Sequence, residues 1–432
     1  MKVIPIFLTF FVFNITTIAQ TFWIQQTSPT SNTLECIKTI DSNVVWACGQ
    51  NGTVLRTING GTDWTITNSP NAEWDCISIE AIDANTAWVA SVKNNGGNTT
   101  LYKTIDGGVT WTIKQSSNEN ECFYNAVKFY DKDHGILYGD PENGYFTIYT
   151  TEDGGETWLR TDSSKIPSPN GAEYGVINNL AISGNYAWFG TQNDNNGINA
   201  RVFRSEDRGK TWSAIPIEEY SFINTISFST DSYGIIVCNN NEVGYTRDGG
   251  LTWKIQWVPL IGSSSSFATA SSFILVGGPW SNISTDGGVT WEQQETNARG
   301  FEAVSFANSF NGWTVGFMGE IYKWIGDALP DLPVSLNDKF ENNVPSEFKL
   351  EQNYPNPFNP STTIEYSIPQ KSQVIVQVYD LLGREITTLI NEEKAAGNYS
   401  VKFDGSNFNS GVYFYKLTVG EFSNTKKLVL LK

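Results

Sequence analysis

The stretch Thr104-Ile105-Asp106-Gly107-Gly108-Val109-Thr110-Trp111 decides the fold, because related copies of it recur along the chain. Four of these follow the same pattern, [Ser/Thr]-x-Asp-x-Gly-x-Thr-Trp, at residues 151–158, 205–212, 246–253 and 284–291. A degenerate copy spans residues 57–64, where Asn59 replaces the acid and Asp63 replaces the second threonine. Glycine permits positive φ in a tight hairpin loop, and an aspartate can accept hydrogen bonds from the amides of that loop. The pattern therefore predicts a recurring hairpin whose tryptophan begins the next strand.

The spacing of the motif tryptophans predicts the architecture. They recur every ~40 to 50 residues, the length of one four-stranded propeller blade, at Trp64, Trp111, Trp158, Trp212, Trp253 and Trp291. A second pattern, an alternating strand followed by an aromatic-to-glycine strand, precedes each motif and occurs a seventh time at residues 304–316. The seventh unit has a third strand, residues 320–324, but no motif, and residues 21–26 resemble the strand that follows each motif. We therefore predict an all-β, seven-bladed β-propeller closed by the N-terminal strand, which removes the exposed sheet edge.

The repeated motif resembles the Asp-box of BNR-repeat proteins, a family that includes sialidases, xyloglucanases, sortilin-type receptors and photosystem II assembly factors. The resemblance implies that the boxes lie at the periphery of the blades, away from any active face. Six carboxylates around a ring cannot converge on one substrate, so we expect their oxygens to be occupied by turn hydrogen bonds. This structural role is expected for Asp106, Asp153, Asp207, Asp248 and Asp286.

Sialidase activity is not expected. Sialidases of this family clamp their substrate with three arginines, and their Phe-Arg-Ile-Pro motif is absent here. Arg201, Arg204, Arg208 and Arg247 lie in or beside boxes, so we expect them to face outward. Xyloglucanase-like enzymes use two tandem propellers, and this chain has the pattern of one.

Composition excludes several classes of partner. The 432-residue chain has a net charge of -17, which argues against nucleic acid and against an anionic membrane surface. The single histidine, His134, rules out a two-histidine metal centre, and its position indicates an ordinary turn residue. We expect no metal and no cofactor. Five cysteines without CxxC spacing leave at least one thiol unpaired in a monomer.

Both ends of the chain carry signals for export. Residues 1–19 combine one lysine with a short apolar run and small residues before a cleavage point, which predicts a signal peptide rather than a membrane anchor. The propeller is expected at residues 20–326 and a proline-containing linker at 327–345. Alternating strands from residue 346 to 432 predict a small immunoglobulin-like β-sandwich.

The last segment resembles the type A C-terminal sorting domain of the type IX secretion system. The resemblance rests on the Tyr-Pro-Asn-Pro-Phe-Asn sequence at residues 354–359, on residues 378–384 and 411–416, and on the terminal residues 427–432. It implies passage across the outer membrane of a Bacteroidota-like bacterium, often with removal of the domain, and contact with the secretion machinery. An ordinary immunoglobulin-like adhesion module is the alternative.

If a ligand face exists, propeller geometry places it on the loops that join the fourth strand to the first and the second to the third. Aromatic rings and carboxylates in these loops could contact a sugar or a peptide, but packing of the aromatics between blades is the favoured interpretation. The candidate residues are Trp74, Asp75, Glu121, Tyr124, Asp140, Glu173, Tyr174, Tyr220, Arg299 and Glu302, with Glu142, Tyr145, Trp257 and Trp280 in the same loops.

The sequence favours a secreted or surface-displayed monomer that binds a glycan or a protein without catalysis. The alternative is an extracellular glycoside hydrolase, sialidase-like or xyloglucanase-like, that uses a carboxylate pair on the channel face. An assembly factor fits the repeat but not the export signals.

Overall fold

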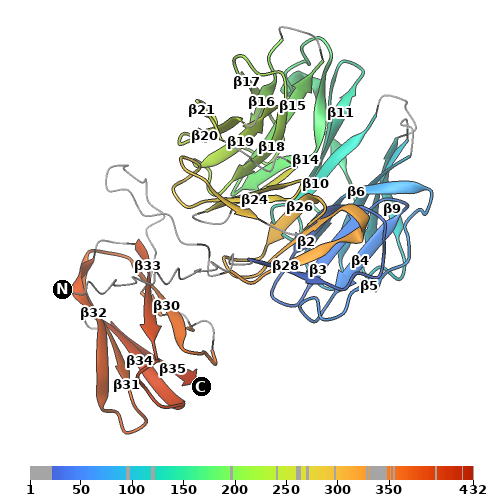
Figure 1. Ribbon diagram of the computed structural model, residues 1–432. Helices are drawn as coiled ribbons and strands as arrows, with labels where there is room; N and C mark the ends of the chain where they lie inside the picture. Colours follow the sequence, from blue (N-terminus) through green and yellow to red (C-terminus); the bar gives the residue numbers. More distant parts are fainter. Residues whose placement is uncertain are drawn as a thin grey trace, which may run out of the picture. The chain divides into compact units, whose positions relative to one another are not determined.

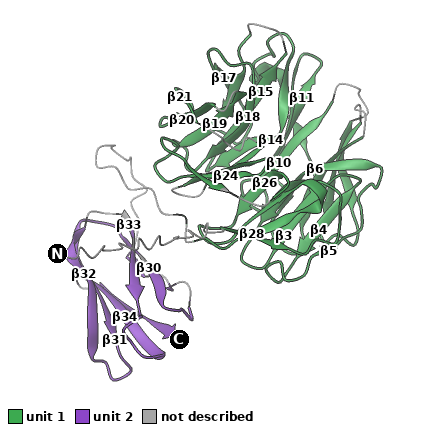
Figure 2. Cartoon of the chain, in the orientation of Figure 1, with its two compact units in different colours: residues 1–334 green, residues 335–432 purple. Residues whose placement is uncertain are grey.

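The computed structural model describes residues 22–93, 98–117, 122–194, 198–239, 242–258, 264–268, 272–295, 298–326, 329, 348–350, 352–353, 356–394, 397–420 and 422–431. The predicted signal peptide and Glu121 lie outside these residues, as does the predicted linker apart from Leu329. The chain divides into two compact units, residues 1–334 and 335–432 (Figure 2). Two 3-10 turns, Ser163–Lys165 and Phe317–Gly319, lie in the described residues. No helix in the described part of the chain is long and apolar enough to cross a membrane.

The first unit consists of four-stranded antiparallel sheets, like the blades of a propeller (Figure 1). Six of them use four consecutive strands each. These sheets are β2–β5 (Leu34–Thr39, Val45–Gly49, Thr53–Thr57, Thr65–Ile66), β6–β9 (Trp74–Ala81, Ala87–Lys93, Thr99–Thr104, Thr112–Ser117), β10–β13 (Tyr124–Phe129, Gly135–Glu142, Tyr145–Thr151, Leu159–Arg160), β14–β17 (Glu173–Ser183, Tyr186–Asn193, Arg201–Ser205, Ser213–Pro216), β18–β21 (Ile223–Phe228, Gly234–Cys238, Glu242–Thr246, Lys254–Trp257) and β22–β25 (Ser265–Ala268, Phe273–Gly277, Trp280–Ser284, Glu292–Glu295).

In each sheet of four consecutive strands, the first strand is the inner one. Inner strands contact each other in the order β2, β6, β10, β14, β18, β22 and β26 (Phe301–Phe306), and β26 in turn contacts β2. The two-residue alternation of each strand places apolar side chains between neighbouring sheets. There the rings of Trp188 and Phe228 stack with centroids 3.6 Å apart, as do those of Trp88 and Phe129 at 3.9 Å. The core therefore lies in the layers between sheets.

The remaining sheet combines both ends of the unit. Its order is β1-β28-β27-β26, where β1 is Trp23–Gln26, β27 is Gly312–Gly316 and β28 is Ile321–Trp324. Trp23 lies opposite Trp324 in an antiparallel register. The Trp23 ring is buried against Trp324 and Phe306, and its Nε1 donates to Ser281 Oγ at 3.2 Å. The N-terminal strand is thus held by hydrogen bonds and by an aromatic cluster.

The second unit contains two antiparallel sheets around its own apolar core. One sheet has the order β29-β30-β33 and the other β32-β31-β34-β35. The strands are β29 (Lys349–Leu350), β30 (Ser361–Ile368), β31 (Ser372–Tyr379), β32 (Glu385–Lys394), β33 (Gly397–Asp404), β34 (Gly411–Val419) and β35 (Phe422–Leu430).

The opening motif of this unit binds its last strand. Asn356 Oδ1 accepts from the Val429 amide at 2.8 Å, and the Phe358 amide donates to the Val429 carbonyl at 2.9 Å. Phe358 itself is buried in the core. The first and last of the sequence motifs of residues 346–432 therefore form one structural element.

All five cysteines are buried and free. Cys36 and Cys48 lie opposite each other on β2 and β3, and Cys76 belongs to the same apolar cluster.

We predict that Trp23→Ala lowers the free energy of unfolding of the first unit by about 3 to 5 kcal/mol, because a buried ring leaves a cavity between two sheets. Urea unfolding followed by tryptophan fluorescence measures this loss. Ile24→Ala is the matched control, since Ile24 lies on the same strand with 52% exposure and its removal should change stability by about 0.5 kcal/mol or less. Equal effects of the two substitutions would show that β1 does not stabilise the unit.

Candidate functional site

The box carboxylates are fully engaged by their own loops. In the first complete copy, Thr110 donates its amide to Asp106 Oδ1 at 2.9 Å and its hydroxyl to Oδ2 at 2.6 Å. Thr104 donates its hydroxyl to Asp106 Oδ1 at 2.8 Å and accepts from the Gly108 amide at 2.9 Å. Hydrogen bonds from Thr110 lower the pKa of Asp106 to about 2. The same geometry recurs at Asp153, Asp207, Asp248 and Asp286.

The degenerate copy keeps this geometry with altered donors. Asn59 Oδ1 accepts from the Asp63 amide at 3.0 Å, as the aspartate does elsewhere. Its Nδ2 then donates to Asp63 Oδ2 at 2.9 Å, so donor and acceptor have exchanged places relative to an Asp–Thr pair. Hydrogen-bond complementarity within the loop explains why Asn and Asp change together.

Irregular pairing marks the inner strands at the end opposite the boxes. The register shifts by one residue near the start of β2, β6, β10, β18 and β26, and by several residues in β14. Such bulges leave a residue outside the regular ladder and redirect its side chain. Each one-residue shift leaves one residue of the inner strand without a paired residue on the next strand. These residues are Glu35, Ile77, Asn125, Asn224 and Glu302.

Three carboxylates gather on the adjacent inner strands β26, β2 and β6. Burial, together with the neighbouring Glu35 charge, raises the pKa of Glu302 to about 7. Burial also raises the pKa of Glu35; its hydrogen bond with Gln50 opposes this shift and the Asp75 charge adds to it. Asp75 and Glu302 were expected at the site from the sequence, and Glu35 was not. Its position in the bulge of β2 could not be read from the alternation of that strand.

The irregular segment of β14 reaches this acidic cluster. Asn178 Nδ2 donates to the Ile77 carbonyl at 2.7 Å and to the Glu35 carbonyl at 3.3 Å. Because β10 lies between β6 and β14 in the order of inner strands, Asn178 crosses the space that the inner strands enclose. Its φ of 56° is tolerated by asparagine better than by most residues. Its Oδ1 is buried and has no hydrogen-bond partner among the described residues.

Several expected site residues lie in internal contacts. Tyr124 is fully buried, with its ring edge against Tyr149. Glu173 is buried and forms an ion pair with Arg201, and it also accepts from Thr191 Oγ1 at 2.7 Å. Asp140 accepts from Asn125 Nδ2 at 2.8 Å and from the Gly175 amide at 2.9 Å. Burial outweighs these hydrogen bonds and raises the pKa of Asp140 to about 6.

The other expected residues are more open. Trp74 begins β6 and is half-buried, while Arg299 is exposed and pairs with Glu320. Burial, with the hydrogen bond from Tyr174 to Asp194, raises the pKa of Tyr174 to about 12. Burial and a hydrogen bond with Glu242 also raise the pKa of Tyr220.

The prediction that Arg201 and Arg204 face outward is wrong. Arg201 is buried because Glu173 neutralises its charge. Arg204 has a side-chain exposure of 10% and donates from Nε to the Gly249 carbonyl of the next sheet at 2.8 Å.

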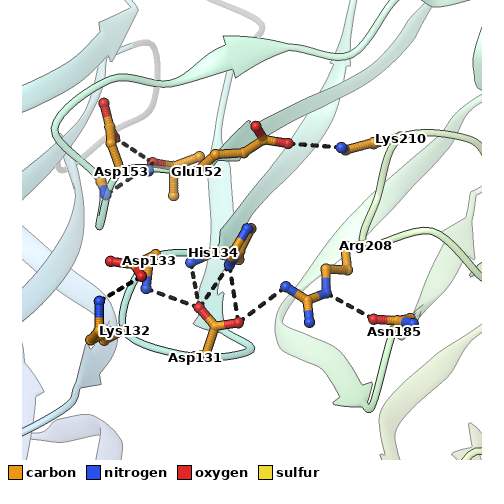
Figure 3. Close-up of polar contacts among 11 residues, drawn as sticks. Asp131, Lys132, Asp133, His134, Glu152, Asp153, Asn185, Arg208 and Lys210 are labelled. Atoms are coloured by element: carbon orange, nitrogen blue, oxygen red, sulfur yellow. Dashed lines mark hydrogen bonds and ion pairs between the residues drawn. The ribbon is translucent and has the colours of Figure 1, made fainter.

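His134 lies in the turn between β10 and β11. Its amide donates to Asp131 Oδ1 at 2.9 Å, and its Nδ1 lies 2.8 Å from the same oxygen (Figure 3). Asp41 and Asp83 accept the equivalent amides in the turns of two other sheets. The backbone conformation at His134 is therefore that of the repeated turn.

The acidic cluster can act in two ways. A carboxyl group with a pKa near 7 exchanges its proton at neutral pH, as a general acid does. Once ionised, the cluster attracts a cationic group. No group of three or more His, Cys, Asp and Glu side chains suited to a metal ion occurs in the described residues.

Comparison with known proteins matches the second unit to a family and the first unit to a fold. Residues 352–431 match the family model described as secretion system C-terminal sorting domain, which confirms the predicted resemblance of this segment. No curated protein matches the chain.

Two solved structures resemble the chain over most of their own length. YCF48 from Cyanidioschyzon merolae is 17% identical with a TM-score of 0.55, covering 70% of this chain and 99% of that one. A structure described as YCF48 bound to D1 peptide is 18% identical with a TM-score of 0.54, covering 72% and 99%. These likenesses show a β-propeller fold, consistent with the BNR-like propeller expected from the boxes.

We predict that Glu302→Gln stabilises the protein at pH 8 and leaves its stability unchanged at pH 4. Glu302 has a folded pKa of about 7 against an ordinary 4.5, so the native state holds more protons between these values and loses stability as pH rises through them. Above pH 7 the parent keeps a partly buried charge that glutamine lacks. Urea midpoints at both pH values measure the difference.

Glu73→Gln, at an exposed position, is the control for loss of one charge. If Glu302→Gln and the parent lose stability equally between pH 4 and 8, Glu302 does not titrate in this range.

Proposed function

Residues 352–431 belong to the family of secretion system C-terminal sorting domains, and from this premise we propose that the chain is an extracellular binding protein. A type IX sorting domain indicates export to the cell surface or secretion, with the secretion machinery as a partner. The first unit is then the cargo. We assign residues 1–19 to the signal peptide, 20–326 to the cargo, 327–345 to the linker and 346–432 to an immunoglobulin-like sorting domain.

We further propose that the cargo is a seven-bladed propeller closed by its N-terminal strand. The cyclic contacts of the inner strands and the pairing of β1 with β28 support this arrangement. In such a ring the bulged ends of the inner strands surround one mouth of the central channel. Glu35, Asp75 and Glu302 would then face one ligand.

The acidic cluster is the observation that carries the binding function. Burial raises the pKa of Glu302, and repulsion from ionised Glu35 adds to this shift. A lysine or arginine side chain entering the channel mouth would relieve this repulsion. We therefore favour a protein ligand with a basic segment over a neutral glycan. A peptide is bound in one structure of similar fold, the YCF48 complex.

Binding of basic peptides to the full chain tests the proposal. Isothermal titration with a lysine-rich peptide library should yield binders whose affinity falls from pH 8 to pH 5, because Glu302 becomes protonated in this range. Glu35→Gln should weaken binding by roughly tenfold, as expected for loss of one charge-assisted contact. Glu73→Gln should have no effect. Binding that is insensitive to both pH and Glu35→Gln would exclude the cluster as the site.

A glycoside hydrolase is the second candidate, favoured by one observation. Glu302, with a pKa of about 7 beside the acidic Glu35, is the type of pair in which one carboxyl donates a proton and the other acts as base or nucleophile. Release of reducing sugar from extracellular polysaccharides, abolished by Glu302→Gln, would establish this activity. Peptide binding without hydrolysis would exclude it.

We predict that removal of residues 346–432 leaves a folded propeller in the periplasm. The structure gives the sorting domain its own core, so its loss should not unfold the cargo. Cell fractionation and limited proteolysis measure location and folding. Fusion of residues 346–432 to an unrelated periplasmic reporter is the control and should move the reporter out of the cell. Export of the truncated chain at the parental level would contradict the assignment.

A further inference from the structure

The β31–β32 hairpin of the second unit holds two adjacent leucines in solvent. Leu381 and Leu382 are 67% and 78% exposed, and Leu382 is the most exposed of the large apolar side chains in the described residues. Single exposed apolar residues are ordinary on protein surfaces, whereas adjacent ones mark candidate contact surfaces. The tip of this hairpin is therefore a candidate contact surface.

Hydrogen bonds within the turn fix the backbone that carries the leucines. Asp380 Oδ1 accepts from the amides of Leu382 and Arg384, both at 2.9 Å, and Oδ2 accepts from Arg384 Nε at 2.7 Å. Gly383 donates its amide to the Asp380 carbonyl at 3.0 Å and has a φ of 75°, which glycine adopts readily. These contacts use the backbone of Leu382 and neither leucine side chain. The turn itself therefore keeps both side chains in solvent and does not need them for its own shape.

The hairpin lies at the end of the sheet where the other motif segments of this unit meet. β31 ends at Tyr379, which pairs with Phe414 near the start of β34, and the start of β34 pairs with the end of β35. Leu431 follows β35 at this same end; it is 54% exposed, and its amide donates to the Phe358 carbonyl at 2.9 Å. The described parts of the four segments that resemble a sorting domain, residues 354–359, 378–384, 411–416 and 427–432, therefore reach one end of the second unit.

We propose that the secretion machinery recognises this end of the second unit, and that Leu381, Leu382 and Leu431 enter an apolar pocket on a protein of that machinery. The inference rests on the proposed export of the chain through its sorting domain. Asp380 and Gly383 shape the turn, so these motif residues act within the unit. The exposed leucines, in contrast, lose their contact with water only when a partner covers them, and this apolar burial supplies the binding free energy.

The charges of the turn favour a protein pocket over a membrane surface. Membrane-binding segments combine apolar side chains with several cations that contact anionic lipids. Among residues 380–385 the cation is Arg384, and its Nη2 pairs with Asp380 Oδ2 at 2.7 Å. The next residue, Glu385, is an exposed acid. An anionic lipid surface would therefore repel this turn, whereas an apolar pocket in a protein can be shaped to the leucines alone.

Replacement of both tip leucines by glutamine tests the proposal. In a bacterium with a type IX secretion system, the exported fraction of the full chain carrying Leu381→Gln and Leu382→Gln should fall roughly tenfold, because polar amides replace the buried apolar contact. Cell fractionation and immunoblotting measure this fraction, and the retained chain should lie in the periplasm. The urea midpoint of the purified variant should equal that of the parent, since both leucines are exposed. If the paired variant loses stability, Leu382→Gln alone decides the question at the more exposed position.

Leu159→Gln together with Ile113→Gln is the matched control. These residues of the first unit are 71% and 62% exposed, so the double change removes a similar apolar surface and leaves the second unit intact. The control should be exported at the parental level. Equal export defects in the two double variants would overturn the proposal, because the effect would then not be specific to the hairpin tip.

The same measurements distinguish this inference from the proposed export. Parental export of the tip variant, combined with periplasmic retention of a chain that lacks residues 346–432, would overturn the leucine surface and leave the sorting assignment standing. Parental export of both chains would contradict both proposals. Co-sedimentation of the full chain with vesicles of phosphatidylethanolamine and phosphatidylglycerol, or a dimer in solution, would also overturn the proposal if the tip substitutions abolished it, because the leucines would then bind lipid or a second copy.

Discussion

Neighbouring sheets of the first unit are joined at the box hairpins, where backbone carbonyls accept hydrogen bonds from cationic side chains of the preceding sheet. Lys103 Nζ donates to the Gly154 carbonyl at 2.7 Å, and Lys323 Nζ donates to the Gly60 carbonyl at 3.0 Å. Arg204 makes the equivalent contact with Gly249. The loop that turns the chain within one sheet therefore also binds the next sheet. This double role requires each carboxylate to hold its loop rigidly.

In the sheet that has no box, the N-terminal strand β1 contacts the neighbouring sheets instead. Trp23 Nε1 of β1 donates to Ser281 in the preceding sheet. Gln26, three residues later, accepts from the indole nitrogens of Trp64 and Trp313, both at 3.0 Å. One short strand thus contacts the sheets on both sides. In the sheet that lacks a box, the N-terminal strand therefore makes the contacts with neighbouring sheets that a box hairpin makes elsewhere.

Sequence periodicity was sufficient to predict the strands and their grouping into sheets, because the boxes and the alternation of apolar residues are local properties of the sequence. It paired β1 with the last sheet correctly, since residues 21–26 carry the pattern of an outer strand. The site residues were harder to predict from the sequence. Tyr124 and Tyr174 both lie near strand starts, yet one is fully buried and the other half-buried, which depends on packing between sheets. Glu35 and Asn178 owe their positions to bulges, which arise from the register of two strands and leave no periodic signal in one.

Carboxylates at the two ends of the strands differ because the backbone around them differs. At the box end, loop amides outside the β-ladder are free to donate, so Asp106 and Asp153 stay ionised with pKa values of about 2. At the bulged end, burial is the largest effect on Glu302 and, with the neighbouring Glu35 charge, raises its pKa to about 7. The bulged end presents carboxyl groups whose charge depends on what binds there.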